Sequence, residues 1–249
     1  MIRVCTDLEA LSSAAAELIA AEAQRAVQAG GRFAVALAGG GTPRRTYEIL
    51  SREPYRKLVP WEKTHVFWGD ERCVAAADPR SNALMARRAL LDHVPVPTVQ
   101  VHPMRCNRSP AASAERYEAV LRSFFAGGAP RFDLILLGLG ENGHTASLFP
   151  GTPVLAERQR WVAEVHVAEE RMHRLTLTLP VINQAAAVVF LVSGGGKASM
   201  LREVLEGSPG PHPVPAALVR PAGRLLWLVD RDAARLLRRG VQRYGGRER

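Results

Sequence analysis

His144 is the residue whose type and setting point most directly to chemistry. It follows an unbroken apolar run at residues 134–137 and three glycines at positions 138, 140 and 143. Such a run is typical of a strand buried on both faces, and open α/β sheets bind ligands at the carboxyl ends of their strands. Because an imidazole titrates near neutrality, we expect His144 to act there as a general base or acid. The alternative is a structural histidine whose ring nitrogens bond to neighbouring carbonyls.

The same segment matches a nucleotide-binding pattern in form only. Residues 138–143 read Gly-Leu-Gly-Glu-Asn-Gly and so satisfy GxGxxG. That fingerprint requires a helix of several turns after the third glycine. Pro150 and Gly151 follow so soon that only about two helical turns fit, at roughly 3.6 residues per turn. The sequence therefore argues against a dinucleotide site.

A glycine-rich turn at residues 39–43 indicates an anion site. Its sequence, Gly-Gly-Gly-Thr-Pro, follows an apolar stretch at 33–38 that is expected to be a strand. Gly40 and Gly41 would let backbone amides approach a ligand, and Thr42 is expected to cap the helix that follows. A helix start with free amides favours phosphate. A tight strand-to-helix turn without a ligand is the alternative.

Lys197 closes a second glycine turn. Residues 193–197 read Ser-Gly-Gly-Gly-Lys after another apolar run at 188–192. The loop is not a Walker A motif, because Ala198 stands where the serine or threonine that binds magnesium is required. An ammonium at a helix start opposes the helix dipole unless an anion lies nearby. We therefore expect Lys197 to contact a phosphate, with a solvated side chain as the alternative.

Two acids and an arginine follow a third expected strand. Residues 68–72 read Trp-Gly-Asp-Glu-Arg. In a functional interpretation, Asp70 takes a polar or proton-transfer role and Arg72 contacts an anion. A cluster of ion pairs with no chemistry explains this motif equally well when it is taken alone.

Spacing argues against several other kinds of site. The remaining six histidines show no metal-ligand motif, so we expect neither a metal nor another cofactor. There is no GxSxG elbow, so a hydrolytic reaction would use an activated water instead of a serine nucleophile. Ser147 is expected to be an ordinary helix or turn residue. Cys5, Cys73 and Cys106 are odd in number and widely spaced, and we expect them to be reduced thiols.

Strand and helix signals alternate along the chain and predict a mostly parallel sheet, covered by helices on both faces, in one domain spanning residues 1–249. The expected strands are 2–5, 33–38, 65–68, 99–102, 134–137, 161–167, 174–179, 188–192 and 225–229. The expected helices are one capped by Thr6 or Asp7 and ending near 30, then 43–51, 81–91, 110–125, one ending near 205, and an arginine-rich helix after 229. This sheet would bring the polar strand ends together.

Composition and charge limit the partners. Apolar residues make up 47% of the chain in runs of strand length only, and the N-terminus lacks a signal-peptide layout, so we expect a cytoplasmic protein away from membranes. The net charge of +9 favours anionic ligands. Seven arginines fall in 231–249, where we expect a flexible basic tail from about residue 241. No basic stripe is interleaved with aromatics, so no nucleic-acid partner is expected.

These segments together, in this order, resemble the 6-phosphogluconolactonase family, and the resemblance covers nearly the whole chain. It rests on the motifs at 39–43 and 68–72, Ser81-Asn82, Gly-Leu-Gly-Glu-Asn-Gly-His-Thr-Ala-Ser-Leu-Phe-Pro-Gly at 138–151, Arg174-Leu-Thr-Leu-Thr, Asn183, Gly196-Lys197-Ala198 and Trp227. The resemblance implies a Rossmann-like three-layer α/β/α fold. It also implies a metal-independent hydrolase of the oxidative pentose phosphate pathway, which opens 6-phospho-D-glucono-1,5-lactone to 6-phosphogluconate.

Site roles follow from the same resemblance. His144 would be the general base that activates water, with Asp70 as a second catalytic residue. Loop amides near Gly40 and Gly41, or within 138–143, would stabilise the oxyanion. The residues expected to bind the phosphosugar lactone are Gly40, Gly41, Thr42, Arg72, Asn142, Arg174 and Lys197. A monomer or a weak homodimer is expected.

Asn142 departs from the family pattern, because many members carry aspartate there. If a carboxylate is needed beside the histidine, Asp70 or Glu141 would supply it. The main alternative is a glucosamine-6-phosphate deaminase, whose segment after the histidine carries a catalytic glutamate; here residues 147–150 provide none. A non-catalytic sugar-phosphate sensor is the other alternative.

Overall fold

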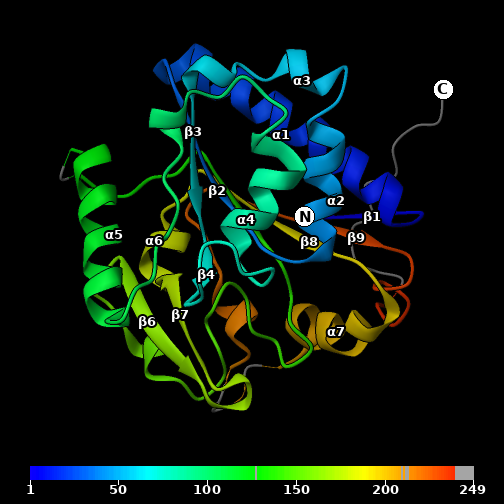
Figure 1. Ribbon diagram of the computed structural model, residues 1–249. Helices are drawn as coiled ribbons and strands as arrows, with labels where there is room; N and C mark the ends of the chain where they lie inside the picture. Colours follow the sequence, from blue (N-terminus) through cyan, green and yellow to red (C-terminus); the bar gives the residue numbers. More distant parts are fainter. Residues whose placement is uncertain (127, 209, 211–212, 239–249) are drawn as a thin grey trace.

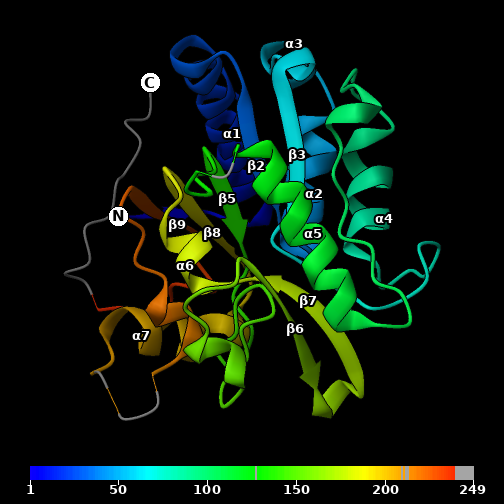
Figure 2. The same cartoon turned by 90° about the vertical axis from the view of Figure 1, so that its left-hand side faces the viewer.

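Six strands form one parallel sheet at the centre of the molecule (Figure 1). The computed structural model describes residues 1–126, 128–208, 210 and 213–238 of the chain. The strands are β1 (Ile2–Cys5), β2 (Phe33–Leu37), β3 (Thr64–Trp68), β5 (Leu134–Leu137), β8 (Ala187–Val192) and β9 (Arg224–Asp230). Their order is β1-β9-β8-β5-β2-β3, with every pairing parallel. Helices lie on both faces (Figure 2), so the predicted three-layer α/β/α fold class is confirmed.

The central strands β2, β5 and β8 are buried along their whole length. This is what their continuous apolar sequences predict, since both faces of a parallel sheet are covered. Val35 pairs with Leu134 on one side of β5, and Ile135 pairs with Val188 on the other. These strands therefore give the loops at their ends a rigid base.

The direction of the fold reverses between β2 and β5. From β2 the chain goes on to β3 at one edge of the sheet, whereas from β5 it goes on to β8 and β9 on the other side. Ligands in open α/β folds bind in the crevice at such a switch point, beyond the carboxyl ends of the strands. The glycine loop after β2 and the His144 loop after β5 both begin at this crevice.

Seven α-helices surround the sheet in the described part of the chain. They are α1 (Leu8–Gly30), α2 (Gly41–Leu50), α3 (Tyr55–Leu58), α4 (Asn82–Ala86), α5 (Pro110–Phe124), α6 (Leu179–Asn183) and α7 (Ala198–Glu206). Asp7 caps α1 by accepting from the Ala10 amide at 2.8 Å. The predicted cap at Thr42 is wrong: α2 begins two residues earlier, with Gly40 as its N-cap at φ 103°, a conformation that glycine adopts without strain.

A second, antiparallel sheet was not predicted. Its order is β4 (Asp70–Arg72), β7 (Met172–Leu177) and β6 (Val162–Val167). The β6–β7 hairpin extends beyond the main sheet and packs against α5 (Figure 2). The alternating residues of β7 indicate a strand, but the pairing with β4 spans about a hundred residues and leaves no local signal. This sheet carries Asp70, Arg72 and Arg174.

Two expected elements are absent where they were predicted. Residues 98–101 form a short 3₁₀ turn with a single bridge from Val101 to Val66 instead of a strand. After β9, residues 231–237 form turns, and the expected arginine-rich helix is not found there. The expected basic tail from about 241 lies outside the described residues. No helix in the described ranges is long and apolar enough to cross a membrane.

The prediction of three reduced thiols is wrong for two of them. Cys73, directly after β4, forms a disulfide with Cys106 in the segment before α5, at a Cα–Cα distance of 4.9 Å. The two cysteines are 33 residues apart in sequence, so only the folded chain brings them together. Cys5 remains a buried free thiol.

Candidate active site

A cavity of about 510 Å³ opens at the switch point of the parallel sheet. Segments after β2, β3, β5 and β6, strand β7 and the turn at Lys197 contribute to its walls. Most of the predicted site residues line it together, namely Gly40, Asp70, Arg72, Asn142, His144, Arg174 and Lys197. Gly41 and Thr42 follow Gly40 in the first turn of α2 but do not line the cavity.

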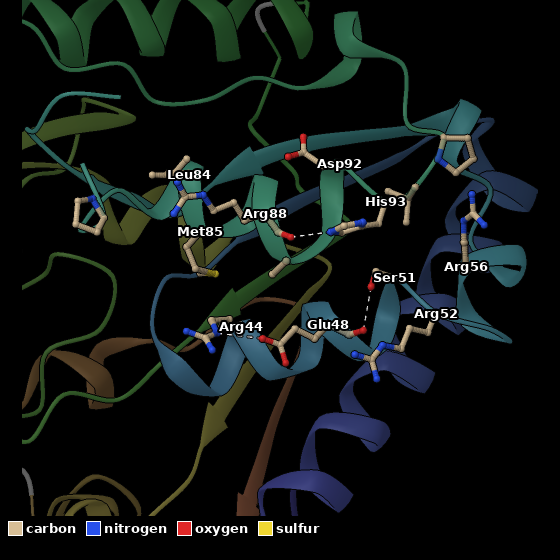
Figure 3. A pocket seen from close by; sticks show the side chains of 14 residues that line it. Arg44, Glu48, Ser51, Arg52, Arg56, Leu84, Met85, Arg88, Asp92 and His93 are labelled. Carbon is tan, nitrogen blue, oxygen red and sulfur yellow. Dashed lines mark hydrogen bonds and ion pairs between the residues drawn. The ribbon is translucent and has the colours of Figure 1, made fainter. Parts of the chain in front are cut away.

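A larger hollow of about 1010 Å³ lies between α2 and the segment that continues α4 (Figure 3). Arg44, Arg52 and Arg88 lie on its rim, and Arg44 pairs with Glu48 at 3.0 Å. Neither the sheet's strand ends nor any predicted site residue lines this hollow. We therefore place the candidate active site in the smaller cavity.

The His144 loop is a tight turn that only glycine permits at two positions. The amide of Gly140 donates to the His144 carbonyl at 2.8 Å, and the amide of Gly143 donates to the Gly140 carbonyl at 3.0 Å. A Cβ atom at Gly140 would come within 2.2 Å of the imidazole, and Gly143 has φ of +81°. The glycines thus let the imidazole fold back over its own loop.

Asn142 fixes the tautomer of His144. Its Oδ1 lies 2.6 Å from Nδ1 of His144 and also accepts from the His144 amide at 3.2 Å. The backbone donor requires an oxygen at this position, and an amide oxygen only accepts. Nδ1 therefore carries the ring proton, and Nε2 keeps its lone pair.

Burial keeps His144 neutral. The half-buried ring stacks on Phe149, with 4.1 Å between ring centroids. Burial, with the nearby charges of Arg174 and Lys197, lowers the pKa of His144 to about 4, and the charge of Asp70 opposes this. At neutral pH the imidazole is therefore unprotonated, as a general base must be.

Asp70 is held in a buried hydrogen-bond network. Its carboxylate is 6% exposed by residue and accepts from the Ser147 hydroxyl at 2.7 Å and the Asn82 side chain at 3.3 Å. The Ser147 amide in turn donates to the hydroxyl of Thr176 on β7 at 3.2 Å. The network ties β4, β7 and the His144 loop together. Ser147 lies in a turn, as predicted, and is fully buried within this network.

Arg174 brings a buried positive charge to the cavity. It is 5% exposed, lies 3.8 Å from the Asp70 carboxylate and pairs closely with Glu170. The hydrogen bond from Arg174 lowers the pKa of Glu170 below its usual value. Arg174 also lies over the Phe149 ring at 5.3 Å from its centroid. Buried charges persist only where they are paired in this way.

Two further cations border the cavity in less enclosed positions. The Nζ of Lys197 lies 3.7 Å from the Glu141 carboxylate. Arg72 donates from NH1 to the Arg80 carbonyl at 2.6 Å, so part of its guanidinium is already engaged. In the Lys197 loop, the Gly194 amide donates to Asp230, and the Lys197 side chain lines the cavity as a group that can bind an anion.

Sequence reasoning missed Glu170 and Phe149 as members of the site. Phe149 belongs to the motif at 138–151 that contains His144, and this closeness in sequence could have indicated that it lies at the site. Glu170 joins the cavity through the β6–β7 hairpin and its pairing with Arg174, and no local pattern marks it. Among the residues the structure describes, no cluster of three histidine, cysteine, aspartate or glutamate side chains could hold a metal. The expectation of a cofactor-free site stays a prediction.

Comparison with known proteins gives the arrangement a context. Residues 6–227 match the family model described as glucosamine-6-phosphate isomerases/6-phosphogluconolactonase. A 6-phosphogluconolactonase of Synechocystis sp. is 45% identical over 86% of this chain and 88% of its own length. The structure of the 6-phosphogluconolactonase from Trypanosoma brucei superposes with a TM-score of 0.84 at 30% identity, covering 96% of this chain and 98% of that one.

A monomeric glucosamine-6-phosphate deaminase shares the fold as well. Its TM-score is 0.80 at 24% identity, covering 94% of this chain and 99% of that one. At this identity the likeness concerns the fold alone, so the choice between the two chemistries depends on the residues of the cavity.

Proposed function

The chain belongs to the glucosamine-6-phosphate isomerase/6-phosphogluconolactonase family, and we propose that it hydrolyses 6-phospho-D-glucono-1,5-lactone to 6-phosphogluconate in the oxidative pentose phosphate pathway. The observation that carries this proposal is His144, which is neutral, has Nε2 free and lies at the switch point among cations. A neutral imidazole suits the activation of water, and the cations suit a phosphorylated substrate.

His144 acts as the general base. Its Nε2 takes a proton from a water molecule as the water oxygen attacks C1 of the lactone. The carbonyl carbon becomes tetrahedral and its oxygen carries the negative charge. When the intermediate collapses, the bond from C1 to the ring oxygen breaks and the imidazolium returns its proton to that oxygen. The products are the C5 hydroxyl and a C1 carboxylic acid, which loses its remaining proton to solvent at neutral pH and becomes the carboxylate.

The amides of Glu141 and Asn142 are the candidate donors to the oxyanion. Within the 138–143 turn, the amides of Gly140 and Gly143 already donate to carbonyls of the loop. Those of Glu141 and Asn142 make no hydrogen bond to any described residue and lie in the same loop, three and two residues before His144. Preorganised amides of this kind stabilise a developing negative charge by about 3 kcal/mol each.

The phosphate is held by the cations and by the start of α2. Arg174 and Lys197 carry most of the charge, and Arg72 contributes what its bond to Arg80 leaves free. The amides of Gly40, Gly41 and Thr42 have no acceptor among the described residues, and Gly40 lines the cavity, so a phosphate at the cavity's edge can reach this helix start. Binding the phosphate orients the lactone for attack.

Asp70 acts on the site through its neighbours. Its carboxylate holds Ser147 at the end of the His144 loop and lies beside Arg174. Its charge also favours the imidazolium that forms during the reaction, since it raises the pKa of His144 against the effect of burial. Asp70 therefore supplies the carboxylate that Asn142 cannot.

The residues after His144 favour lactone hydrolysis over deamination. A deaminase carries a catalytic glutamate in the segment after the histidine, whereas residues 147–150 provide none and Ser147 is fully buried and bonded to Asp70. The test is an assay with fresh 6-phosphogluconolactone, corrected for spontaneous opening, beside one with glucosamine 6-phosphate. Enzymatic opening of the lactone and no release of ammonia are expected. The reverse pattern would identify a deaminase, and binding of both without turnover would identify a sensor.

We also propose that the chain acts as one domain over residues 1–249, as a monomer or weak homodimer in the cytoplasm, where phosphorylated sugars are used. Light scattering after gel filtration measures the oligomeric state. In a reducing cytoplasm the Cys73–Cys106 pair would be held as thiols, although it is a disulfide in this structure. Alkylation of fresh lysate followed by mass spectrometry measures which form is present.

A further inference from the structure

A second cavity, of about 490 Å³, lies on the other face of β4 from the active site. Successive residues of a strand face opposite sides, and accordingly Asp70 lines the active-site cavity while Glu71 lines this one. Arg72 lines both cavities. The Cys73–Cys106 disulfide joins the end of β4 to the opposite wall.

Two hydrogen-bond donors at this cavity are buried without an acceptor. They are Nε1 of Trp68 and Nε of Arg72, and neither has a partner among the described residues. Trp68 is only 1% exposed, so bulk water does not satisfy its indole. Buried donors in folded proteins are nearly always paired. Two orphaned donors beside one cavity therefore indicate an acceptor that the chain itself does not supply.

The acid in the cavity wall is fully engaged. Glu71 accepts hydrogen bonds from the amides of Arg72 at 2.8 Å, Asn82 at 2.7 Å and Ala83 at 2.8 Å, and from the Ser81 hydroxyl at 3.0 Å. Its oxygens are thus turned to the start of α4, where negative charge is favourable. It does not serve as the missing acceptor.

The remaining walls combine apolar surface with positive charge. Leu84, Leu91 and Val101 supply apolar side chains, and Arg87 and Arg105 add two cations. Small-molecule sites have this composition, mostly apolar with a few polar groups, and volumes of roughly 300–1,000 Å³. The cavity's 490 Å³ falls within that range.

We propose that this cavity binds a compact apolar molecule that ends in a carboxylate. The apolar body would lie against the leucine and valine side chains. The carboxylate oxygens would accept from Nε1 of Trp68 and Nε of Arg72, because both groups donate only. A cationic head group would face the arginines, and a neutral one would accept from the donors without the charge that Arg72, Arg87 and Arg105 favour.

Occupancy of this cavity has a consequence for the active site. Arg72 is shared, so a carboxylate on its Nε side draws the guanidinium away from the phosphate side and raises KM for the lactone. This consequence rests on the proposed function, whereas binding in the cavity does not. Direct binding and enzyme kinetics therefore separate a failure of one proposal from a failure of the other.

The experiment uses benzoate as the probe and benzyl alcohol as its uncharged counterpart, with the full chain in its oxidised form. The indole ¹⁵N–¹H signals of the four tryptophans are followed during titration. The Trp68 signal, assigned by its loss in Trp68→Phe, is expected to move with benzoate. Benzoate is expected to bind at least ~10-fold more tightly than benzyl alcohol, the advantage of a charge-assisted hydrogen bond.

Three variants and one control variant complete the test. Trp68→Phe removes the Nε1 donor, keeps an aromatic ring and should erase the preference for benzoate; lactone turnover by this variant reports that it is folded. Ala83→Leu fills the cavity and should abolish binding of both probes. Arg87→Gln should weaken benzoate binding. Arg88→Gln should not, because Arg88 lines the larger hollow beside α2.

An unmoved Trp68 signal up to the solubility limit of benzoate overturns the proposal and leaves ordered water as the partner of the two donors. Equal affinity for the two probes overturns it as well.

Discussion

Two arginine-bearing hollows in this molecule differ in what surrounds their charges. The hollow between α2 and the α4 segment is the larger, at about 1010 Å³, but its Arg52, Arg56 and Arg88 are exposed (Figure 3). The active-site cavity is half that size, at about 510 Å³, and its Arg174 is 5% exposed. Neither volume nor the number of arginines identifies the functional site.

Burial at a strand end accounts for the difference. Exposed ion pairs such as Arg44–Glu48 contribute little, because water screens both partners. In the active-site cavity the parallel strands hold the loops, and burial lowers the pKa of His144 to about 4. The same side-chain types are therefore buried at strand ends in one hollow and solvated in the other. The predictions below test this contrast.

Replacing His144 should have the largest effect. In His144→Ala, lactone hydrolysis should fall by at least ~100-fold, because the general base is lost, while binding of 6-phosphogluconate is retained. Initial rates corrected for spontaneous opening, together with calorimetry, measure both. His93→Ala, a histidine lining the larger hollow, is the matched control and should keep full activity. Comparable rates for His144→Ala and the wild type would remove His144 from the mechanism.

Replacing Arg174 should act chiefly on binding. Arg174→Gln should raise KM by at least ~10-fold, since a charged contact to the phosphate is lost. It should also raise the pKa of His144, because the charge of Arg174 lowers it. Steady-state kinetics over a pH series measure both KM and the pKa of His144. The substitution leaves Asp70 and Glu170 without the guanidinium that pairs with them, so thermal unfolding is used to show that the variant is folded. An unchanged KM in a folded variant would rule out the phosphate assignment.

Asn142→Asp should have a smaller effect, visible in the pH profile. A carboxylate beside Nδ1 stabilises the imidazolium, so the pKa of His144 should rise by about one unit. The neutral base is then lost at a higher pH, and the acid limb of kcat/KM should move upward while activity near pH 7 is maintained. A limb that stays in place or moves downward would show that Asn142 does not contact the catalytic imidazole.

Replacing the arginines of the larger hollow should have the smallest effect on lactone hydrolysis. Arg52→Gln and Arg88→Gln should leave kcat/KM unchanged within about twofold, because exposed arginines away from the substrate affect it only through screened long-range attraction. A loss as large as that of Arg174→Gln would abolish the distinction between the two hollows.

Local sequence patterns correctly predicted the strands of the parallel sheet and the loops at their carboxyl ends. The buried strands β2 and β5 and the glycines before His144 can be predicted from a few consecutive residues, because a strand and a tight turn are determined by neighbours in sequence. The pairing of β4 with β7, which joins Arg174 to Asp70, depends on contacts about a hundred residues apart. The Cys73–Cys106 disulfide and the place of Glu170 have the same origin. Asn142 departs from the family pattern in sequence, and only its contact with Nδ1 in the folded loop shows that it orients His144.

The proposed mechanism requires that burial keep His144 neutral with Nε2 free. A titration of its ring nitrogens by ¹⁵N NMR tests this most directly, with His144→Ala to assign the signals. We predict a proton on Nδ1 and a pKa of about 4. A pKa between 6 and 7, or a proton on Nε2 at neutral pH, would contradict the account.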